Sequence, residues 1–224
     1  MIVNYFLDPT LDDILPKSAW LELTKRGKGP DKGYNRCYAK KQADINTFHV
    51  LCPWDIHFKF AIGKSMEKGM YAFDEYTKNL IKVMAIRYQE ADQVEYNNPV
   101  VQISLPFTFY TKKTCYLEMR HSYYSPKHCR TIEAKFDISS WVRPINWSFE
   151  IDAFDREIKI KRGEVLCEVA FHTDKVENIT LKENDDPDPR LVKLSKNNPI
   201  SPGFIKGVAR LLPHGKKLLQ KLVR

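Results

Sequence analysis

Short runs of alternating apolar and polar residues, separated by turn residues, become frequent from residue 99 onward. Residues 101–107, 132–138 and 147–151 each carry apolar side chains at every second position. Side chains point to opposite faces of a strand in turn, so this period predicts strands with one buried face. Strands that recur about every ten residues, with turns between them, are typical of sandwiches and jelly rolls. We therefore expect a mainly β fold, an antiparallel β-sandwich of which the jelly roll is one form.

The first half of the chain carries weaker signals. Residues 56–62 alternate in the same way and predict a further strand. Residues 74–92 carry apolar side chains at helical spacing, although residues 80–84 fit a strand as well, and the length of the segment favours a helical insertion. Pro106 cannot donate a backbone hydrogen bond, so it predicts a bend or an edge position in its strand.

Residues 156–174 read REIKIKRGEVLCEVAFHTD and predict two strands joined by an Arg-Gly turn. Cys167 alternates with Val165, Val169 and Phe171, so we expect its thiol to face the core as a small apolar group.

The C-terminal part differs from the rest in composition. Residues 183–190, ENDDPDPR, combine an acidic cluster with two prolines and predict a solvated linker. Apolar residues then recur at helical spacing in residues 203–224, where Pro213-His214-Gly215 should divide the segment into two short helices. We expect a β domain over residues 1–182, a linker over 183–202 and a basic amphipathic helical tail over 203–224.

The net charge of +8 comes mostly from this tail. Six of the 36 basic residues lie in residues 203–224 with no acid, which leaves 30 basic and 28 acidic residues elsewhere, a net charge of +2. The body therefore lacks a strong field for attracting polyanions. The tail can pack on its own domain, contact an oligomer mate or another protein partner, or bind an anionic surface of lipid or nucleic acid. The cations expected to make these contacts are Lys206, Arg210, Lys216, Lys217 and Lys221.

The cysteines and the N-terminal residues bear on the compartment. Five widely spaced cysteines, an odd number, favour reduced thiols and hence a cytoplasmic protein. The first residues lack the pattern of a signal peptide, and no apolar run reaches 18 residues. Cys37, which follows Arg36 in a polar stretch, is the thiol whose surroundings best suit reactivity.

Histidines raise the question of a metal site. His172 and Asp174 have the His-x-Asp spacing of two-oxoglutarate oxygenases, and His214 follows 42 residues later, with Arg224 ten residues beyond it. His214, however, lies in the tail and not on a strand. His49 with Cys52, and His121 with His128-Cys129, lack the matching second pair of a structural zinc site. We expect no metal or other cofactor, and keep His172, Asp174 and His214 as the alternative ligand set.

Cations next to aromatic residues give the best candidates for ligand binding. Arg120 and His121 precede two tyrosines, and Trp141 and Trp147 flank Arg143, which Pro144 follows. Such groups can stack on bases or sugars or bind a carboxylate. The alternative is that Arg143 covers an aromatic ring or pairs with an acid such as Asp137 at the edge of a sandwich.

Several motifs occur in a fixed order along residues 30–171: Gly33-Tyr34-Asn35-Arg36-Cys37, Leu51-Cys52-Pro53, Leu105-Pro106-Phe107-Thr108-Phe109-Tyr110-Thr111, Asp137-Ile138, Trp141-Val142-Arg143-Pro144-Ile145-Asn146-Trp147-Ser148-Phe149, and Ile160 with Arg162-Gly163-Glu164-Val165-Leu166-Cys167. In these motifs the chain resembles an uncharacterised protein family, a domain of unknown function found in bacteria and their phages. Residues 64–98 form a longer insertion than the family pattern has. The family has no established activity, so the resemblance implies an architecture and a phage association, not a chemistry.

Together these observations favour a non-catalytic binding or assembly protein of the cytosol. The competing hypotheses are an enzyme with a pocket on a sheet face near Arg143, for which a metal-dependent oxygenase is one form, and a protein that binds nucleic acid or a membrane surface through its tail.

Overall fold

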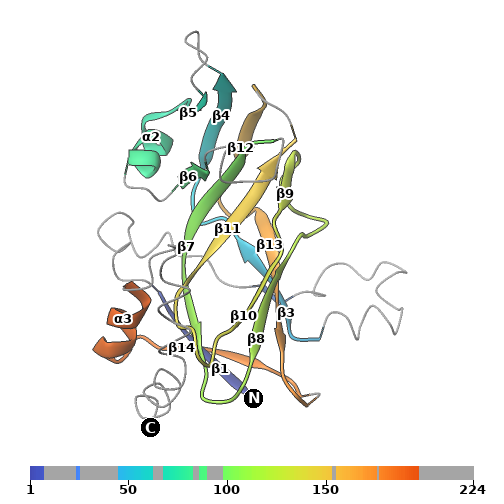
Figure 1. Cartoon of the computed structure of the whole chain (residues 1–224), viewed down its shortest axis with the longest axis vertical. Coiled ribbons are helices and arrows are strands. Elements are labelled where there is room, and N and C mark those ends of the chain that lie inside the picture. Colours follow the sequence, from blue (N-terminus) through green and yellow to red (C-terminus); the bar gives the residue numbers. More distant parts are fainter. Residues whose placement is uncertain are drawn as a thin grey trace.

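The computed structural model describes residues 1–7, 24–25, 45–62, 68–82, 86–89, 98–152, 155–175 and 177–196. In these residues the chain forms fourteen strands and two helices, which confirms the mainly β composition. The strands form three sheets, here called A, B and C. Neighbouring strands are antiparallel except β1 and β14, which pair in parallel. Sheet C and helix α2 (Glu75–Lys82) lie at one end of the molecule, and β1, β14 and helix α3 (Pro189–Lys196) lie at the other (Figure 1).

Each sheet joins strands that are distant in sequence. Sheet A runs β14 (Thr180–Glu183), β1 (Ile2–Leu7), β7 (Val100–Tyr110), β11 (Pro144–Ile151) and β9 (Cys129–Thr131), with β6 (Ile86–Gln89) also on β7. Sheet B runs β10 (Ala134–Asp137), β8 (Tyr116–Arg120), β13 (Val165–His172), β3 (Thr47–Leu51) and β2 (Thr24–Lys25). Sheet C runs β12 (Glu157–Ile160), β4 (Ile56–Ile62) and β5 (Lys68–Ala72). Apolar side chains from all three sheets meet in a single buried cluster.

The Arg-Gly turn of residues 161–164 lies at a corner between sheets B and C. The strands on its two sides, β12 and β13, pair with β4 and β3, and not with each other. The chain therefore crosses between sheets B and C twice, once from β3 to β4 and once from β12 to β13. Hydrogen bonds from Gly163 N to Cys52 O (2.9 Å) and from Cys52 N to Glu164 O (2.7 Å) join the two crossings. Gly163 has φ of 86°, which a side chain would strain. The predicted turn and strands are confirmed, and Cys167 is buried as expected.

Pro106 lies in β7 at the point where the strand changes its pairing partner. The residues before it, Val100–Ile103, pair with β6, and those after it, Phe107–Tyr110, pair with β1. On the other edge of β7, the register with β11 shifts between Pro144 and Asn146. The missing backbone donor of Pro106 therefore falls where the pairing is interrupted.

The segment 74–92, whose length favours a helical insertion, contains both a helix and a strand. Helix α2 ends at Lys82, and Ile86–Gln89 form a strand on β7, where the buried Ile86 faces Ile103. Pairing with the central strand buries this apolar side chain, which outweighs the local helical period. Asp74 caps the helix, since its carboxylate accepts from Thr77 N at 2.6 Å.

The strand expected over residues 132–138 is divided between two sheets. Thr131 ends β9 in sheet A, opposite Phe149, and Ala134 begins β10 in sheet B, opposite Met119. Ile138 is buried as expected, whereas Ala134 is exposed. The alternation continues across the change of sheet, so the sequence pattern does not reveal the break.

Residues 183–196, expected to lie in a linker, are folded onto the body. Glu183 ends β14, and α3 begins at Pro189. Leu191 of α3 is buried with Phe6, Tyr110 and Val142 in a second apolar cluster. This apolar contact holds α3 against the body. The acidic and proline residues between Glu183 and Pro189 connect β14 to α3. The expected tail, residues 203–224, lies outside the described residues.

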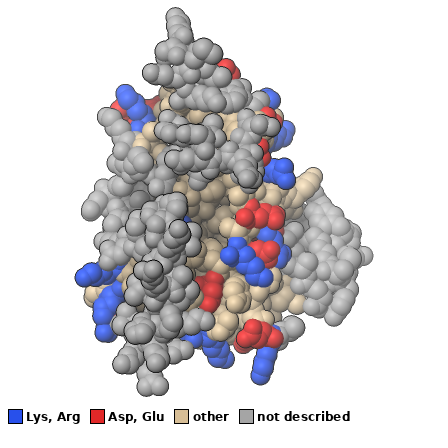
Figure 2. Space-filling model, viewed as in Figure 1, with Lys and Arg blue, Asp and Glu red and all other residues tan. Residues whose placement is uncertain are grey.

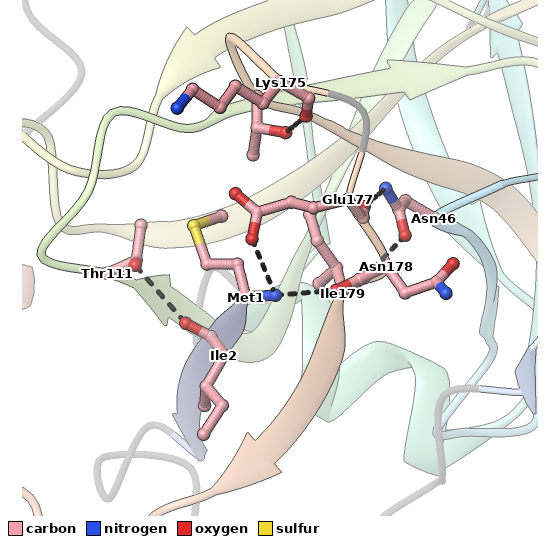
Figure 3. A network of polar contacts seen from close by, with 9 residues as sticks. Met1, Ile2, Asn46, Thr111, Lys175, Glu177, Asn178 and Ile179 are labelled. Carbon is pink, nitrogen blue, oxygen red and sulfur yellow. Dashed lines mark hydrogen bonds and ion pairs between the residues drawn. The ribbon is translucent and has the colours of Figure 1, made fainter.

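The first residue is held by a polar network that joins β1 to residues 177–179 (Figure 3). The ammonium group of Met1 donates to the carbonyl of Asn178 at 2.7 Å and pairs with the Glu177 carboxylate at 3.0 Å. The side chain of Asn46 donates to the Glu177 carbonyl at 2.8 Å and accepts from Ile179 N at 2.7 Å. The ion pair holds the pKa of Glu177 below its ordinary value. These contacts fix the parallel pairing of β1 with β14.

Neither of the helices in the described residues is long and apolar enough to cross a membrane.

Candidate functional site on the outer face of sheet B

One face of sheet B carries most of its polar side chains. In β8, Leu117 and Met119 face the core, so Tyr116, Glu118 and Arg120 lie on the opposite side. The register places Glu168 of β13 opposite Arg120, and His49 of β3 opposite Glu168. The outer face of sheet B is defined here by Tyr116, Glu118, Arg120, Glu168, Ala170, His172 and His49.

Glu118, Arg120 and His172 form a charged network across β8 and β13. The Oε2 atom of Glu118 accepts from the Arg120 guanidinium and lies 2.6 Å from Nε2 of His172. Nε2 of His172 is also 3.2 Å from Nη2 of Arg120, but arginine can only donate hydrogen bonds. The shorter distance to a carboxylate favours Nε2 as a donor to Glu118. The Arg120 hydrogen bond, above all, and then that of His172 hold the pKa of Glu118 below its ordinary value.

A second histidine–glutamate pair lies on the same face in a buried setting. Glu168 accepts a hydrogen bond from Ser122 Oγ at 3.0 Å, and its Oε1 atom is 3.5 Å from Nε2 of His49. Nε2 of His49 is buried and forms no hydrogen bond in the described part of the chain. The ring of Tyr124 packs edge-on against His49, with centroids 5.6 Å apart. Ser122 is itself held by Ser125, whose hydroxyl donates to Leu166 O at 2.6 Å.

On this face burial is greatest at Glu168, and the network around His172 is more exposed. The side chain of Glu118 is 26% exposed and that of His172 is 38% exposed, whereas Glu168 is only 4% exposed. Tyr116 is exposed as well, and Lys135 of the neighbouring strand β10 lies over its ring, 5.6 Å from the centroid. The part of the face around β10, β8 and His172 is therefore open to solvent, and the part around Glu168 and His49 is closed.

Of the residues predicted to bind a ligand, Arg120 alone belongs to this face. His121 follows it and is exposed, and its Nδ1 atom accepts a hydrogen bond from Thr131 N at 3.3 Å. Trp147 is fully buried in the core, where it stacks on Phe149 and donates from Nε1 to Thr131 Oγ1 at 2.9 Å. A ligand on the surface cannot reach its ring in this arrangement.

Arg143 and Trp141 lie at the other end of β8. Trp141 N bonds to Asp137 O at 3.0 Å, and Asp137 faces Tyr116, four residues and hence about 13 Å along the strand from Arg120. The Arg143 guanidinium covers the Trp141 ring at 4.6 Å from its centroid. This is the arrangement expected if Arg143 covers an aromatic ring, and it separates the two sets of predicted ligand-binding residues.

Where the structure describes them, the histidines and cysteines considered as metal ligands or reactive thiols lie in separate places. In the described residues, no group of three or more His, Cys, Asp and Glu side chains has the geometry to hold a metal ion. His172 contacts Glu118, Asp174 is exposed, and His214 lies outside the described residues, as does Cys37. Cys52, Cys115, Cys129 and Cys167 are buried, and burial raises the pKa of all four thiols, to about 12 for Cys52 and Cys115. They behave as core side chains.

Sequence reasoning missed Glu118, Glu168 and Ser122. The alternation Tyr116-Leu117-Glu118-Met119-Arg120 does place Glu118 on the same face as Arg120, so this part of the site had a signal. Glu168 lies in the apolar run Val165–Phe171, and nothing in that run shows that a serine and a histidine from other strands surround it.

Two comparisons with known proteins found no relative of this chain. A scan against protein-family models found no match, and a search of curated proteins also found none.

Proposed function

We propose that this protein is a non-catalytic binding or assembly module built as a β-sandwich, in which sheets A and B are the two layers. Its binding surface is the open part of the outer face of sheet B, and its ligand is a protein partner. The observation that carries this proposal is the half-exposed network of Glu118, Arg120 and His172 on rigid strands. The resemblance to a bacterial and phage family, and the reduced-thiol composition, support an assembly role in the cytoplasm.

The chemistry of this surface suits a protein better than a small molecule. Arginine and tyrosine are enriched in protein interfaces, and Arg120 and Tyr116 lie on the same exposed strand face. Complementary charges fix the register of a partner, because a like charge placed opposite Glu118 or Arg120 would cost several kcal/mol. Among the described residues on the face shown in Figure 2, charges of both signs are interspersed and form no broad field of one sign for a polyanion.

A charge-swapped variant tests the proposal. Wild type and the double variant Glu118→Arg/Arg120→Glu, which has the same net charge, are each immobilised, and the proteins that they retain from a cell extract are compared by quantitative mass spectrometry. We expect a partner whose retention falls at least tenfold in the swapped variant, and which binds purified wild type with the same difference. Sedimentation velocity on both proteins determines whether that partner is a second copy of the chain.

Lys175→Ala, an exposed cation on the turn after β13, is the matched control and should retain the partner. Equal retention by wild type and the swapped variant, or no partner of wild type, would contradict the proposal.

The oxygenase hypothesis stays an alternative that the same protein preparation can test. A metal bound by Nε2 of His172 would have to displace the contact of that atom with Glu118. Stoichiometric iron or zinc in the purified protein, lost in His172→Ala, would favour an enzyme over the binding module.

The tail contributes a second proposed contact through Lys206, Arg210, Lys216, Lys217 and Lys221. We propose that it packs on the domain or on a partner chain. Deletion of residues 203–224 should then change the oligomeric state or the stability of the protein. An unchanged state, together with lost binding to anionic vesicles or DNA, would instead identify a surface anchor.

A further inference from the structure

The solvent face of sheet C carries two aromatic rings next to charged side chains. In the register, His57 and Lys59 of β4 lie between β12, which contributes Lys159 and Glu157, and β5, which contributes Tyr71. Phe73 continues the row beyond β5, because its backbone N bonds to His57 O at 2.9 Å. The core side chains of β4, Ile56, Phe58 and Phe60, point the other way. Tyr71 and Phe73 therefore lie two residues apart on the same exposed face.

Both rings lie against the sheet. The phenol end of Tyr71 reaches back over Gly69, where a Cβ would lie 3.7 Å from Cε2 of the ring. The ring therefore lies over Gly69, at the ordinary van der Waals distance from the place that a Cβ there would occupy. Phe73 stacks on the His57 imidazole, with centroids 4.4 Å apart and an angle of 22° between the planes. Tyr71 is nevertheless 44% exposed and Phe73 is 50% exposed. Each ring is thus supported from below and open above.

The support under Phe73 is itself fixed in place. Nε2 of His57 lies 2.5 Å from Oε1 of Glu157, and the backbone N of His57 donates to Thr77 Oγ1 at 3.0 Å. Thr77 is in turn bonded to Asp74 at the start of α2. The orientation of the imidazole, and with it that of Phe73, is set before any ligand arrives, which lowers the entropic cost of binding.

The charges around the rings are nearly balanced. Lys59 lies 3.6 Å from Asp155, and Lys159 is exposed on the same strand as Glu157, so two lysines lie among two carboxylates, and Glu157 also contacts His57. A site for single-stranded nucleic acid combines stacking rings with a clearly positive groove, and the described residues of this face do not form one. A site for an apolar helix would not place carboxylates and lysines among its rings.

From this geometry we propose that Tyr71 and Phe73 form a carbohydrate-binding platform. The C–H bonds on one face of a pyranose ring form an apolar surface that packs on an aromatic ring, while its hydroxyl groups need donors and acceptors at the edge. Glu157 and Asp155 supply acceptors, and Lys59 and Lys159 supply donors. Tyr71 and Phe73 are two residues apart in an extended segment, about 7 Å along the backbone, which suits a chain of at least two sugar units. This site is on a different sheet from the protein-binding face and does not depend on it.

Calorimetric titration of the full chain tests the platform with a panel of neutral hexasaccharides: cellohexaose, laminarihexaose, xylohexaose, mannohexaose and chitohexaose. We expect at least one to bind wild type, with an affinity that falls at least tenfold in Tyr71→Ala and in Phe73→Leu. Phe73→Leu keeps an apolar side chain over His57 but removes the ring face, so it separates lost stacking from lost folding. Tyr123→Ala, which removes an aromatic ring 91% exposed on another part of the surface, should bind as wild type does.

A twelve-residue oligothymidylate is titrated in parallel. Binding of this oligonucleotide with the same dependence on Tyr71 and Phe73, without sugar binding, would overturn the carbohydrate proposal in favour of nucleic acid. The proposal also fails if no hexasaccharide binds wild type, or if Tyr71→Ala and Phe73→Leu bind with unchanged affinity. None of these outcomes affects the Glu118/Arg120 surface, which the charge-swapped variant tests separately.

Discussion

Two histidine–glutamate pairs on the outer face of sheet B differ in almost everything but composition. Glu168 and His172 are four residues apart on β13 and point to the same side, yet Glu168 is buried with His49 and Ser122, while His172 is half-exposed with Glu118 and Arg120. The buried pair is loose, at 3.5 Å, and its carboxylate depends on a serine hydroxyl. The open pair is close, at 2.6 Å, and is reinforced by an arginine.

This difference separates a structural from a functional role for the same residue types. Stability falls strongly when a buried carboxylate loses its hydrogen bonds. It falls in the same way when the carboxylate is removed and a buried hydroxyl is left without an acceptor. A half-exposed ion pair contributes little to stability, because water screens it, but it remains available to a partner. The closed half of the face should therefore determine folding, and the open half should determine recognition.

The largest expected effect is on stability when Glu168 is removed. Glu168→Ala leaves the buried hydroxyl of Ser122 without its acceptor and opens a cavity beside His49, so we expect a loss of about 2 to 3 kcal/mol in the free energy of unfolding. Glu118→Ala, on the same face, should cost less than about 1 kcal/mol. Urea denaturation of the two variants measures both values, and equal losses would contradict the division of the face into a closed and an open half.

A smaller effect is expected at the border between the halves. Ala170 is buried, and it lies opposite Glu118 on one side and Thr47 on the other. Its small side chain leaves room for Arg120 and His172 to approach each other over β13. Ala170→Val should cost about 1 kcal/mol through overpacking, although valine suits a strand.

Ala170→Ser, which is closer in size to alanine, is the control and should cost less than Ala170→Val in the same urea experiment. If Ala170→Val is as stable as wild type, the surroundings of Ala170, between the closed and the open half of the face, are not closely packed.

The smallest expected effect is the loss of stability at low pH when Glu118 becomes protonated. The pKa of Glu118 is lowered in the folded state from its ordinary value near 4.5, so the network adds stability at every pH above that value. The contribution is lost as the pH falls through the lowered, folded-state pKa. We expect wild type to be more stable than Glu118→Gln by about 0.5 kcal/mol at pH 7, with the difference disappearing toward pH 3. Urea midpoints measured between pH 3 and pH 7 give this curve, and a difference that grows toward low pH would refute it.

Much of the fold could be predicted from particular residues. The alternation in residues 56–62 and 101–107, the Arg-Gly turn before Val165 and the inward thiol of Cys167 all follow from local periods and turn chemistry, and the structure confirms them. The strand at Ile86 and the helix at Pro189 could not be predicted in this way, because burial against distant strands decides them.

The candidate site divides in the same manner. The sequence predicts Arg120 as a ligand-binding residue and offers His172 only in an alternative metal-ligand set, and nothing in it joins the two. They meet because β8 and β13 are neighbours in sheet B, with Glu118 between them. Trp141 and Trp147 had equal standing in the sequence, and only the packing places one under Arg143 at the surface and the other in the core.

The sequence by itself determined that this chain forms strands with one apolar face, where it turns, and that its body carries almost no net charge, because these properties depend on residues next to each other or on simple sums. The tertiary structure decided which strands are neighbours, and with them which acid meets which base and which aromatic ring stays open to solvent. Those contacts join residues about fifty to a hundred positions apart, His172 with Glu118 and His57 with Glu157 among them, and no local pattern encodes the long-range pairing that brings them together.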